Sequence, residues 1–136
     1  KRLFSIAFAQ KAPYFATISP RFEELRPGYA RVSMRKRRGV TNHIGTVHAI
    51  AMCNLAELAA GTMTEVSIPA SMRWLPKGMH VEYVKKSSGG VHAVATLPEV
   101  AEGAGRDVPA SVEIKDDTGE VVCRATITMW VSPRRK

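Results

Sequence analysis

The sequence predicts one α+β domain in which a long helix packs against an antiparallel sheet. Residues 47–64 are rich in Ala, Leu and Met, carry apolar residues on nearly every side and lack Pro and Gly before Gly61, which is typical of a buried helix. Before and after this segment, apolar and polar residues alternate, which is the pattern of half-buried strands. A chain of 136 residues can form one such core. We therefore expect a single domain over 1–136, with 1–15 as an N-terminal extension that has room for a short helix.

The first predicted element is a hairpin whose arms are 18–25 and 29–37, with a turn at 26–28. In the second arm, alternate residues are apolar and should face the core: Ala30, Val32 and Met34. Pro20 cannot donate to a central ladder, so we expect it at an edge or a bulge. A loop at 38–45, rich in residues that interrupt regular structure, precedes the helix.

The strands after the helix are predicted from a return of the two-residue period. Turns are expected at 87–90 and 116–119, and a looser connection at 103–107. The predicted strands are 79–84, 91–97, 110–115 and 120–131. The element order is therefore β-β-α-β-β-β-β, the arrangement in which one antiparallel sheet covers one helix. A helix this apolar would leave one face wet in a single chain, so we expect an oligomer that covers it.

The net charge of +8 is concentrated near the N-terminus, because residues 1–38 contain ten Lys and Arg against two Glu. This asymmetry favours a phosphate-bearing ligand, a nucleic acid or a membrane surface there, with a solvated basic face as the alternative. Nucleic acid is disfavoured because we expect no exposed aromatic residues interleaved with the Arg residues of the basic hairpin. No apolar run approaches the roughly 18 residues that span a bilayer.

The two cysteines, Cys53 and Cys123, have no CxxC or His/Cys ligand spacing. We expect both to be reduced, buried small hydrophobes in a cytoplasmic protein. His80 and His92 lack a second ligand at a useful spacing, so we predict no metal site. No nucleotide-binding glycine motif is present, and no cofactor is expected.

The informative side chain is Glu57, the only charged residue in the predicted helix between residues 49 and 64. Burial of an isolated carboxylate is costly unless something compensates for it. Glu57 is therefore a functional candidate, and a structural ion pair is the alternative.

Residues 42–50 place several polar groups at the predicted helix N-terminus. Unpaired backbone N–H groups at such an end favour a developing oxyanion. His48 and Glu57 are nine positions apart, which at about 100° per residue puts them on opposite sides of one helix. A two-fold dimer with antiparallel helices would bring the helix start of one chain towards Glu57 of the other.

The pattern Asn42-x-x-Gly45-x-x-His48, followed by Glu57 in Leu55-Ala56-Glu57-Leu58-Ala59, resembles the hotdog thioesterases related to phenylacetyl-CoA thioesterase. Their motif runs Asn-x-x-Gly-x-x-His-Gly-Gly, followed by Leu-(Ala/Val)-Asp. The resemblance implies a hotdog fold, six antiparallel strands wrapped around one central helix. It implies that Glu57 is the general base or nucleophile and that Asn42 orients water. By the same resemblance, His48 contacts the thioester carbonyl and the N–H of Ala49 forms the oxyanion hole.

The sequence departs from that motif in three ways. Ala49-Ile50 replaces the glycine pair, Glu replaces Asp, and no Ser or Thr near Pro76-Lys77 matches the one that some relatives supply. Residues 72–79 instead resemble a thioesterase-like branch whose members mostly lack an assigned substrate.

These observations lead to two hypotheses. The first is an acyl-CoA thioesterase, acting at the interface of a homodimer or dimer of dimers; acyl carrier protein is an alternative carrier of the acyl group. The second is a dimeric, non-catalytic module that binds acyl-CoA or a fatty acyl group. Substrate contacts are expected from Gly45, Met52, Leu55, Arg37 and Arg38, although the basic run at 35–38 is equally consistent with a solvated strand end.

Overall fold

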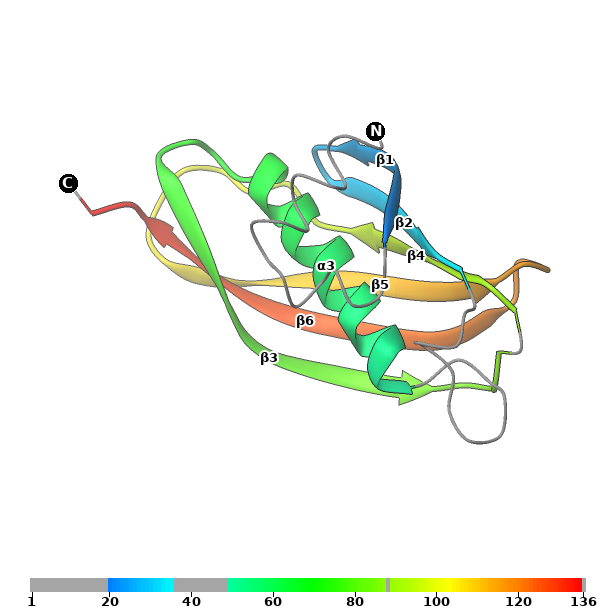
Figure 1. Ribbon diagram of the computed structural model, residues 1–136. Helices are drawn as coiled ribbons and strands as arrows, with labels where there is room; N and C mark the ends of the chain where they lie inside the picture. Colours follow the sequence, from blue (N-terminus) through cyan, green and yellow to red (C-terminus); the bar gives the residue numbers. More distant parts are fainter. Residues whose placement is uncertain (1–19, 36–48, 88, 136) are drawn as a thin grey trace.

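The computed structural model describes residues 20–35, 49–87 and 89–135. The elements follow the order predicted from the sequence, with one helix after two strands and four strands after the helix (Figure 1). They are β1 (Arg21–Arg26), β2 (Tyr29–Met34), α3 (Ala49–Ser67), β3 (Met72–Tyr83), β4 (Val91–Thr96), β5 (Arg106–Asp116) and β6 (Val121–Pro133).

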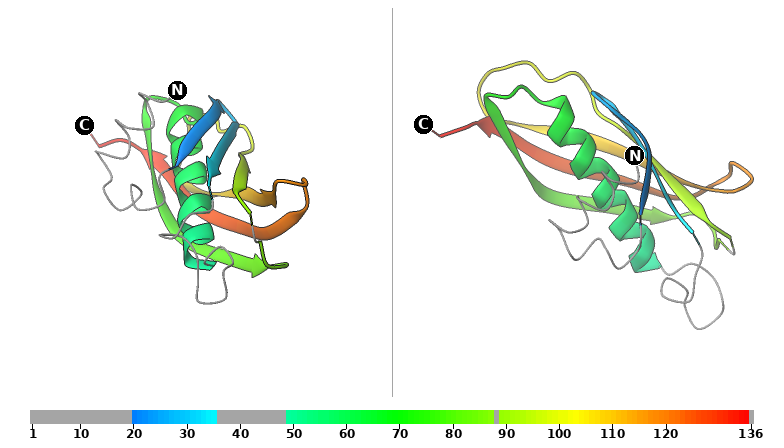
Figure 2. Two further views of the ribbon diagram at one scale, coloured as in Figure 1. Left: turned by 45° about the vertical axis from the view of Figure 1, so that its right-hand side comes forward. Right: turned by 45° about the horizontal axis from the view of Figure 1, so that its top comes forward.

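The six strands form one antiparallel sheet in the order β1-β2-β4-β5-β6-β3. The sheet curves around α3, which lies along its concave face (Figure 2). Strands β1 and β3 are the two edges, so the strands that flank the helix in sequence, β2 and β3, are separated in the sheet by β4, β5 and β6. One long helix enclosed by an antiparallel sheet is the predicted architecture, and it is confirmed.

The core lies between the helix and the concave face of the sheet. Alternate strand residues are buried there, as the two-residue period predicts. The predicted inward residues of β2, Ala30, Val32 and Met34, are at most 2% exposed. In β6 the alternation from Val121 to Val131 gives six inward residues, and the first of them, Val121, is half-buried. The other five are at most 4% exposed: Cys123, Ala125, Ile127, Met129 and Val131.

Two strands begin earlier than the sequence predicts. β3 starts at Met72 instead of 79, and β5 starts at Arg106 instead of 110. Each added segment contains a proline, which normally interrupts a strand. Pro76 is accommodated because β3 is an edge strand with an irregular register between Pro76 and Gly78. Pro109 pairs with β6 alone, since the pairing of β5 with β4 ends at Ser111.

Pro20 directly precedes β1, an edge strand with its own register shift between Phe22 and Glu24. The helix extends past the predicted end at 64 to Ser67. In its last turns, side-chain hydroxyls donate hydrogen bonds to backbone carbonyls four residues earlier. Thr64 donates to Ala60 at 2.7 Å, and Ser67 donates to Met63 at 2.5 Å.

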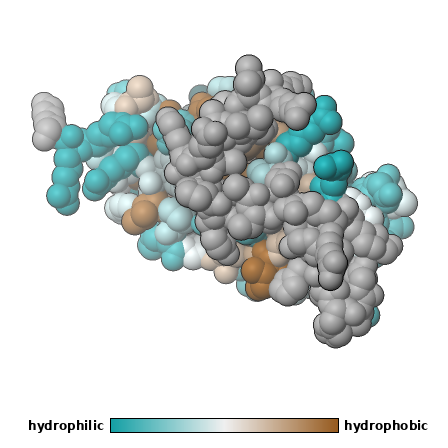
Figure 3. All heavy atoms as spheres, in the orientation of Figure 1, coloured by the Kyte–Doolittle hydropathy of each residue, from teal (hydrophilic) through white to brown (hydrophobic). Residues whose placement is uncertain are grey.

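The helix exposes less apolar surface in the single chain than the sequence predicts. Twelve of the nineteen residues of α3 are buried. The exposed residues are Ile50, Glu57, Glu65 and Val66. Besides Ile50 and Val66 of the helix, apolar side chains are exposed on the edge strand β3 and just beyond it, at Leu75, Met79, Tyr83 and Val84, which are 42–62% exposed. Figure 3 shows apolar atoms, in brown, at the lower edge of the molecule over this strand.

Candidate functional site between α3 and β3

Glu57 is exposed in the middle of an otherwise buried run of α3. The expectation that this carboxylate is buried in the helix is therefore wrong for the single chain. The helix turns Leu55, Ala56 and Leu58 into the core and leaves position 57 on the side that is not covered. The carboxylate thus keeps its contact with water and needs no compensating partner.

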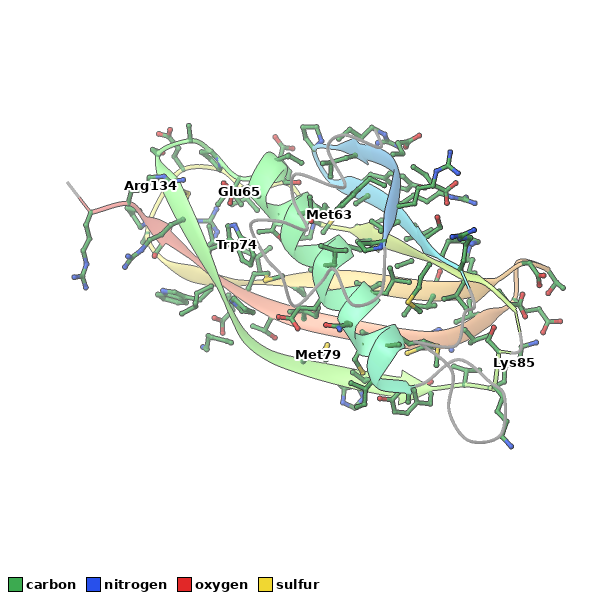
Figure 4. The ribbon with its side chains drawn as sticks, viewed as in Figure 1. Met63, Glu65, Trp74, Met79, Lys85 and Arg134 are labelled. Carbon is green, nitrogen blue, oxygen red and sulfur yellow. The ribbon has the colours of Figure 1, made fainter. Side chains whose placement is uncertain are left out.

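Glu57 nevertheless lines a pocket of about 210 Å³. The other residues of the pocket come from the edge strand β3 and from β6: Pro76, Lys77, Gly78, Met79 and Ile127. Met79 pairs with Ile127 across the β3–β6 ladder, and residues paired in this way lie on one face of a sheet. Since Ile127 is buried against the core, Met79 faces the helix. In Figure 4 Met79 lies between β3 and α3.

The irregular register at Lys77 gives the pocket its shape. Two residues of β3, Pro76 and Gly78, pair with the consecutive residues Met129 and Thr128, so Lys77 is an extra residue in the strand. The Lys77 amine is 3.1 Å from both carboxylate oxygens of Asp107 and lies over the ring of Trp130. The positive charge of Lys77 is thereby paired with the Asp107 carboxylate, and the pocket wall beside Glu57 is mainly apolar.

The predicted site residues that the structure describes are not gathered into one place. Ala49 is the half-buried first residue of α3. It is eight residues from Glu57, or about 12 Å along the axis of an α-helix. Met52 and Leu55 are 4% and 0% exposed, so they belong to the core beneath the surface. The remaining predicted residues lie outside the described residues: Asn42, Gly45, His48, Arg37 and Arg38.

A second polar contact lies near the start of the helix. The Cys53 sulfur is 3.0 Å from the Tyr83 hydroxyl oxygen at the end of β3. This hydrogen bond, with desolvation, raises the pKa of Tyr83 to about 12. Burial raises the pKa of the Cys123 thiol to about 11, and nearby Cys53 adds to the effect. Both cysteines are free, as predicted, but Cys53 is only half-buried.

Sequence reasoning missed the contribution of β3 to the pocket. The signal was present in Pro76-Lys77-Gly78, a break within an otherwise strand-like segment, because Pro and Gly inside a strand mark bulges or close approaches. Which helix residue would face this break could not be read from the sequence, since it depends on how α3 lies across the sheet.

In 20–35, 49–87 and 89–135, no three His, Cys, Asp or Glu side chains are grouped so that they could hold a metal ion. Within the same ranges, no helix has the length and apolar character needed to cross a membrane.

Comparison with solved structures identifies the fold. The crystal structure of genomics APC5556 is 55% identical, with a TM-score of 0.88 over 96% of this chain and 88% of that one. PA5026 from Pseudomonas aeruginosa, a protein of unknown function described as a probable thioesterase, is 25% identical, with a TM-score of 0.83 over 93% and 91% of the two chains. The fold is the hotdog fold of thioesterases, as the sequence resemblance implied.

A more distant structure shares the fold alone. The thioesterase HI1161 from Haemophilus influenzae is 12% identical, with a TM-score of 0.78 over 88% of this chain and 82% of that one. No curated protein matches the sequence significantly. Residues 1–131 match the family described as a domain of unknown function, DUF4442. This match covers nearly the whole chain, and the protein belongs to the DUF4442 family of hotdog-fold domains.

Proposed function

We propose that this protein hydrolyses acyl thioesters, with acyl-CoA as the substrate class and the Glu57 carboxylate as general base or nucleophile. The observation that carries the proposal is the position of Glu57, an exposed carboxylate that interrupts a buried helical run and lines a mainly apolar pocket. The fold is one that thioesterases use. A water-accessible carboxylate beside an apolar pocket supports this proposal, because thioester hydrolysis uses a base and a site for the acyl group.

In the simplest form of the reaction, Glu57 acts as general base. It accepts a proton from water as the water oxygen bonds to the thioester carbonyl carbon. The C–S bond of the tetrahedral intermediate then breaks, and the proton passes to the departing thiolate, giving a carboxylic acid and a thiol. In the alternative form, the carboxylate oxygen attacks the carbonyl carbon, expels the thiolate and forms an anhydride that water then cleaves.

The negative charge that develops on the carbonyl oxygen needs a hydrogen-bond donor. In this proposal the backbone N–H of Ala49, at the start of α3, is that donor, and Asn42 and His48 orient water and the carbonyl. The separation of about 12 Å between Ala49 and Glu57 along one helix is too long for both to act on one carbonyl. We therefore assign the two groups of each site to two copies of the chain.

The edge strand β3 is the surface that supports such a dimer. Its outer edge has no strand partner in the sheet that the structure describes, and it exposes Leu75, with Tyr83 and Val84 at its end. An unpaired apolar edge is a template for pairing with another chain. Two β3 strands paired antiparallel about a two-fold axis would continue the sheet and bring the pocket of each chain next to the second copy.

Substitution of Glu57 by Gln tests the catalytic role. Removal of a general base should lower kcat by about 10²- to 10⁴-fold, measured as thiol release from a panel of acyl-CoA thioesters. Glu99→Gln is the matched control, because it removes the same charge from an exposed position outside the pocket. Near wild-type turnover in Glu57→Gln would exclude Glu57 as base or nucleophile. A wild type that binds acyl-CoA and releases no thiol would instead favour a non-catalytic binding module.

Sedimentation velocity tests the dimer. Leu75→Asp places a charge on the edge of β3 and should shift the protein towards the monomer, because inward or edge charges block strand pairing. Val66→Asp adds the same charge at an exposed position of α3 and should leave the dimer intact. A wild type that sediments as a monomer at assay concentration would contradict the two-copy site.

A further inference from the structure

Met79 differs from the other five methionines of the sequence, all of which lie in the described residues. Those five are at most 4% exposed: Met34, Met52, Met63, Met72 and Met129. Met79 is 42% exposed. Exposed apolar surface of this size favours contact with another apolar group, and Met is used where a surface must adapt to different partners.

The position of Met79 indicates which surface it serves. Its partner in the ladder is Ile127, which is 1% exposed, and both line the pocket that contains Glu57. Leu75 is a contrasting neighbour: it pairs with Trp130 and is 62% exposed, on the face of the sheet that turns away from the helix. The thioether of Met79 is thus presented to the pocket, whereas the side chain of Leu75 is not.

The pocket is small and its wall next to the acid is apolar. A volume of about 210 Å³ is below the roughly 300–1,000 Å³ typical of sites for larger ligands. Of its two charged residues, Lys77 is paired with Asp107, which leaves Glu57 as the charged group available to a ligand. A carboxylate at the end of the acyl chain would be repelled by the Glu57 carboxylate and would lie against an apolar wall.

We propose that Met79 is the specificity-determining residue of this pocket and that the preferred acyl group is a short aliphatic chain. The flexible thioether packs along the chain and limits its length, and the Glu57 carboxylate disfavours an acyl group with a terminal carboxylate. This inference rests on the proposed thioesterase function and extends it to the substrate class.

The test is the acyl-length profile of kcat/KM for acetyl-, butyryl-, hexanoyl-, octanoyl- and succinyl-CoA. The wild type should prefer the short aliphatic members and discriminate against succinyl-CoA. Met79→Ala should raise the relative activity on octanoyl-CoA by about tenfold, and Met79→Phe should restrict activity to acetyl-CoA, since one methylene in an apolar pocket changes specificity by about that factor or more. Val66→Ala is the matched control, because it trims an exposed apolar side chain of α3 outside the pocket and outside the edge of β3, and it should keep the wild-type profile.

Calorimetric binding of the thioethers S-butyl-CoA and S-octyl-CoA to the same four proteins makes the result independent of turnover. If Glu57 is not catalytic, the Met79 variants should still reverse the preference between these two ligands, so the two proposals fail separately. Identical profiles for wild type, Met79→Ala and Met79→Phe would overturn the role of Met79. If the Met79 variants keep the wild-type acyl-length profile but dimerise more weakly, the role of Met79 in specificity would also be overturned, because the second copy would then cover Met79. A wild type that binds neither thioether would overturn it as well.

Discussion

The indole nitrogen of Trp74 donates a hydrogen bond of 2.6 Å to the Glu65 carboxylate (Figure 4), and the Trp74 ring covers Gly61, one turn earlier in α3. A Cβ placed at Gly61 would lie 3.0 Å from Cη2 of the ring. The absence of a side chain at Gly61 thus leaves room for the Trp74 ring against the helix. The contact holds the first half of β3 against α3, while its second half forms the wall of the pocket.

Gly61→Ala should stabilise the protein much less than an Ala substitution usually does in a helix. Ala is favoured over Gly by about 1 kcal/mol in a helix interior, but here its methyl group would press on Trp74. In a Trp74→Leu background the same substitution should recover most of that gain. Urea unfolding of the four proteins of this cycle measures the coupling, and additive effects of the two substitutions would contradict the close approach.

The protein should lose stability in alkali as Tyr83 and Cys123 titrate. The pKa of Tyr83 is raised from 10.0 to about 12 and that of Cys123 from 9.0 to about 11. The folded state therefore holds more protons than the unfolded state over this range. The contribution is complete below pH 9 and declines as pH rises towards 12. Unfolding measured across this range should show a shallower decline for Tyr83→Phe, and an unchanged slope would contradict the assignment.

The two thiols should differ in reactivity with an alkylating reagent. Cys123 is 0% exposed and its pKa is about 11, so little thiolate is present near neutral pH. Cys53 is half-buried near the start of α3, where its sulfur contacts the Tyr83 hydroxyl. Iodoacetamide at about pH 8 should label Cys53 first, and Cys123 only after unfolding, as read by peptide mass spectrometry. Equal labelling rates in the folded protein would contradict the burial of Cys123.

The turn between β5 and β6 should depend on the side chain of Asp116. Its Oδ1 accepts hydrogen bonds from the Thr118 amide at 2.9 Å, the Thr118 hydroxyl at 2.6 Å and the Glu120 amide at 3.0 Å. These bonds to Thr118, with smaller help from Lys85, lower the pKa of Asp116. Its contribution is therefore present above its ordinary pKa of 3.8 and is lost as acid titrates the folded carboxyl.

Asp116→Ala should therefore lower the Tm at neutral pH, and the difference from wild type should shrink in acid. Asp117→Ala, at the exposed next position of the turn, is the matched control and should change Tm less. Thermal unfolding by circular dichroism at neutral and acidic pH gives the comparison. Equal effects of the two substitutions would show that the three hydrogen bonds of Asp116 do not stabilise the turn.

Much of the fold follows from local pattern. The alternation in β2 and β6 predicted which residues enter the core, because side chains of a strand point to opposite faces in turn. The apolar run of α3 predicted the helix and its burial. Prolines misled the prediction of where β3 and β5 begin, because Pro76 and Pro109 are disallowed in a paired central ladder but tolerated where one side of the strand is unpaired.

The candidate site was less accessible from the sequence. Glu57 was recognisable by its type and its apolar surroundings, yet its exposure was decided by the angle at which α3 crosses the sheet. Periodicity determines which residues share a face of one element, whereas the tertiary structure decides what lies opposite that face. The wall formed by Pro76, Met79 and Ile127 combines two strands with a helix residue far away in the chain, and only their packing brings these side chains to the carboxylate.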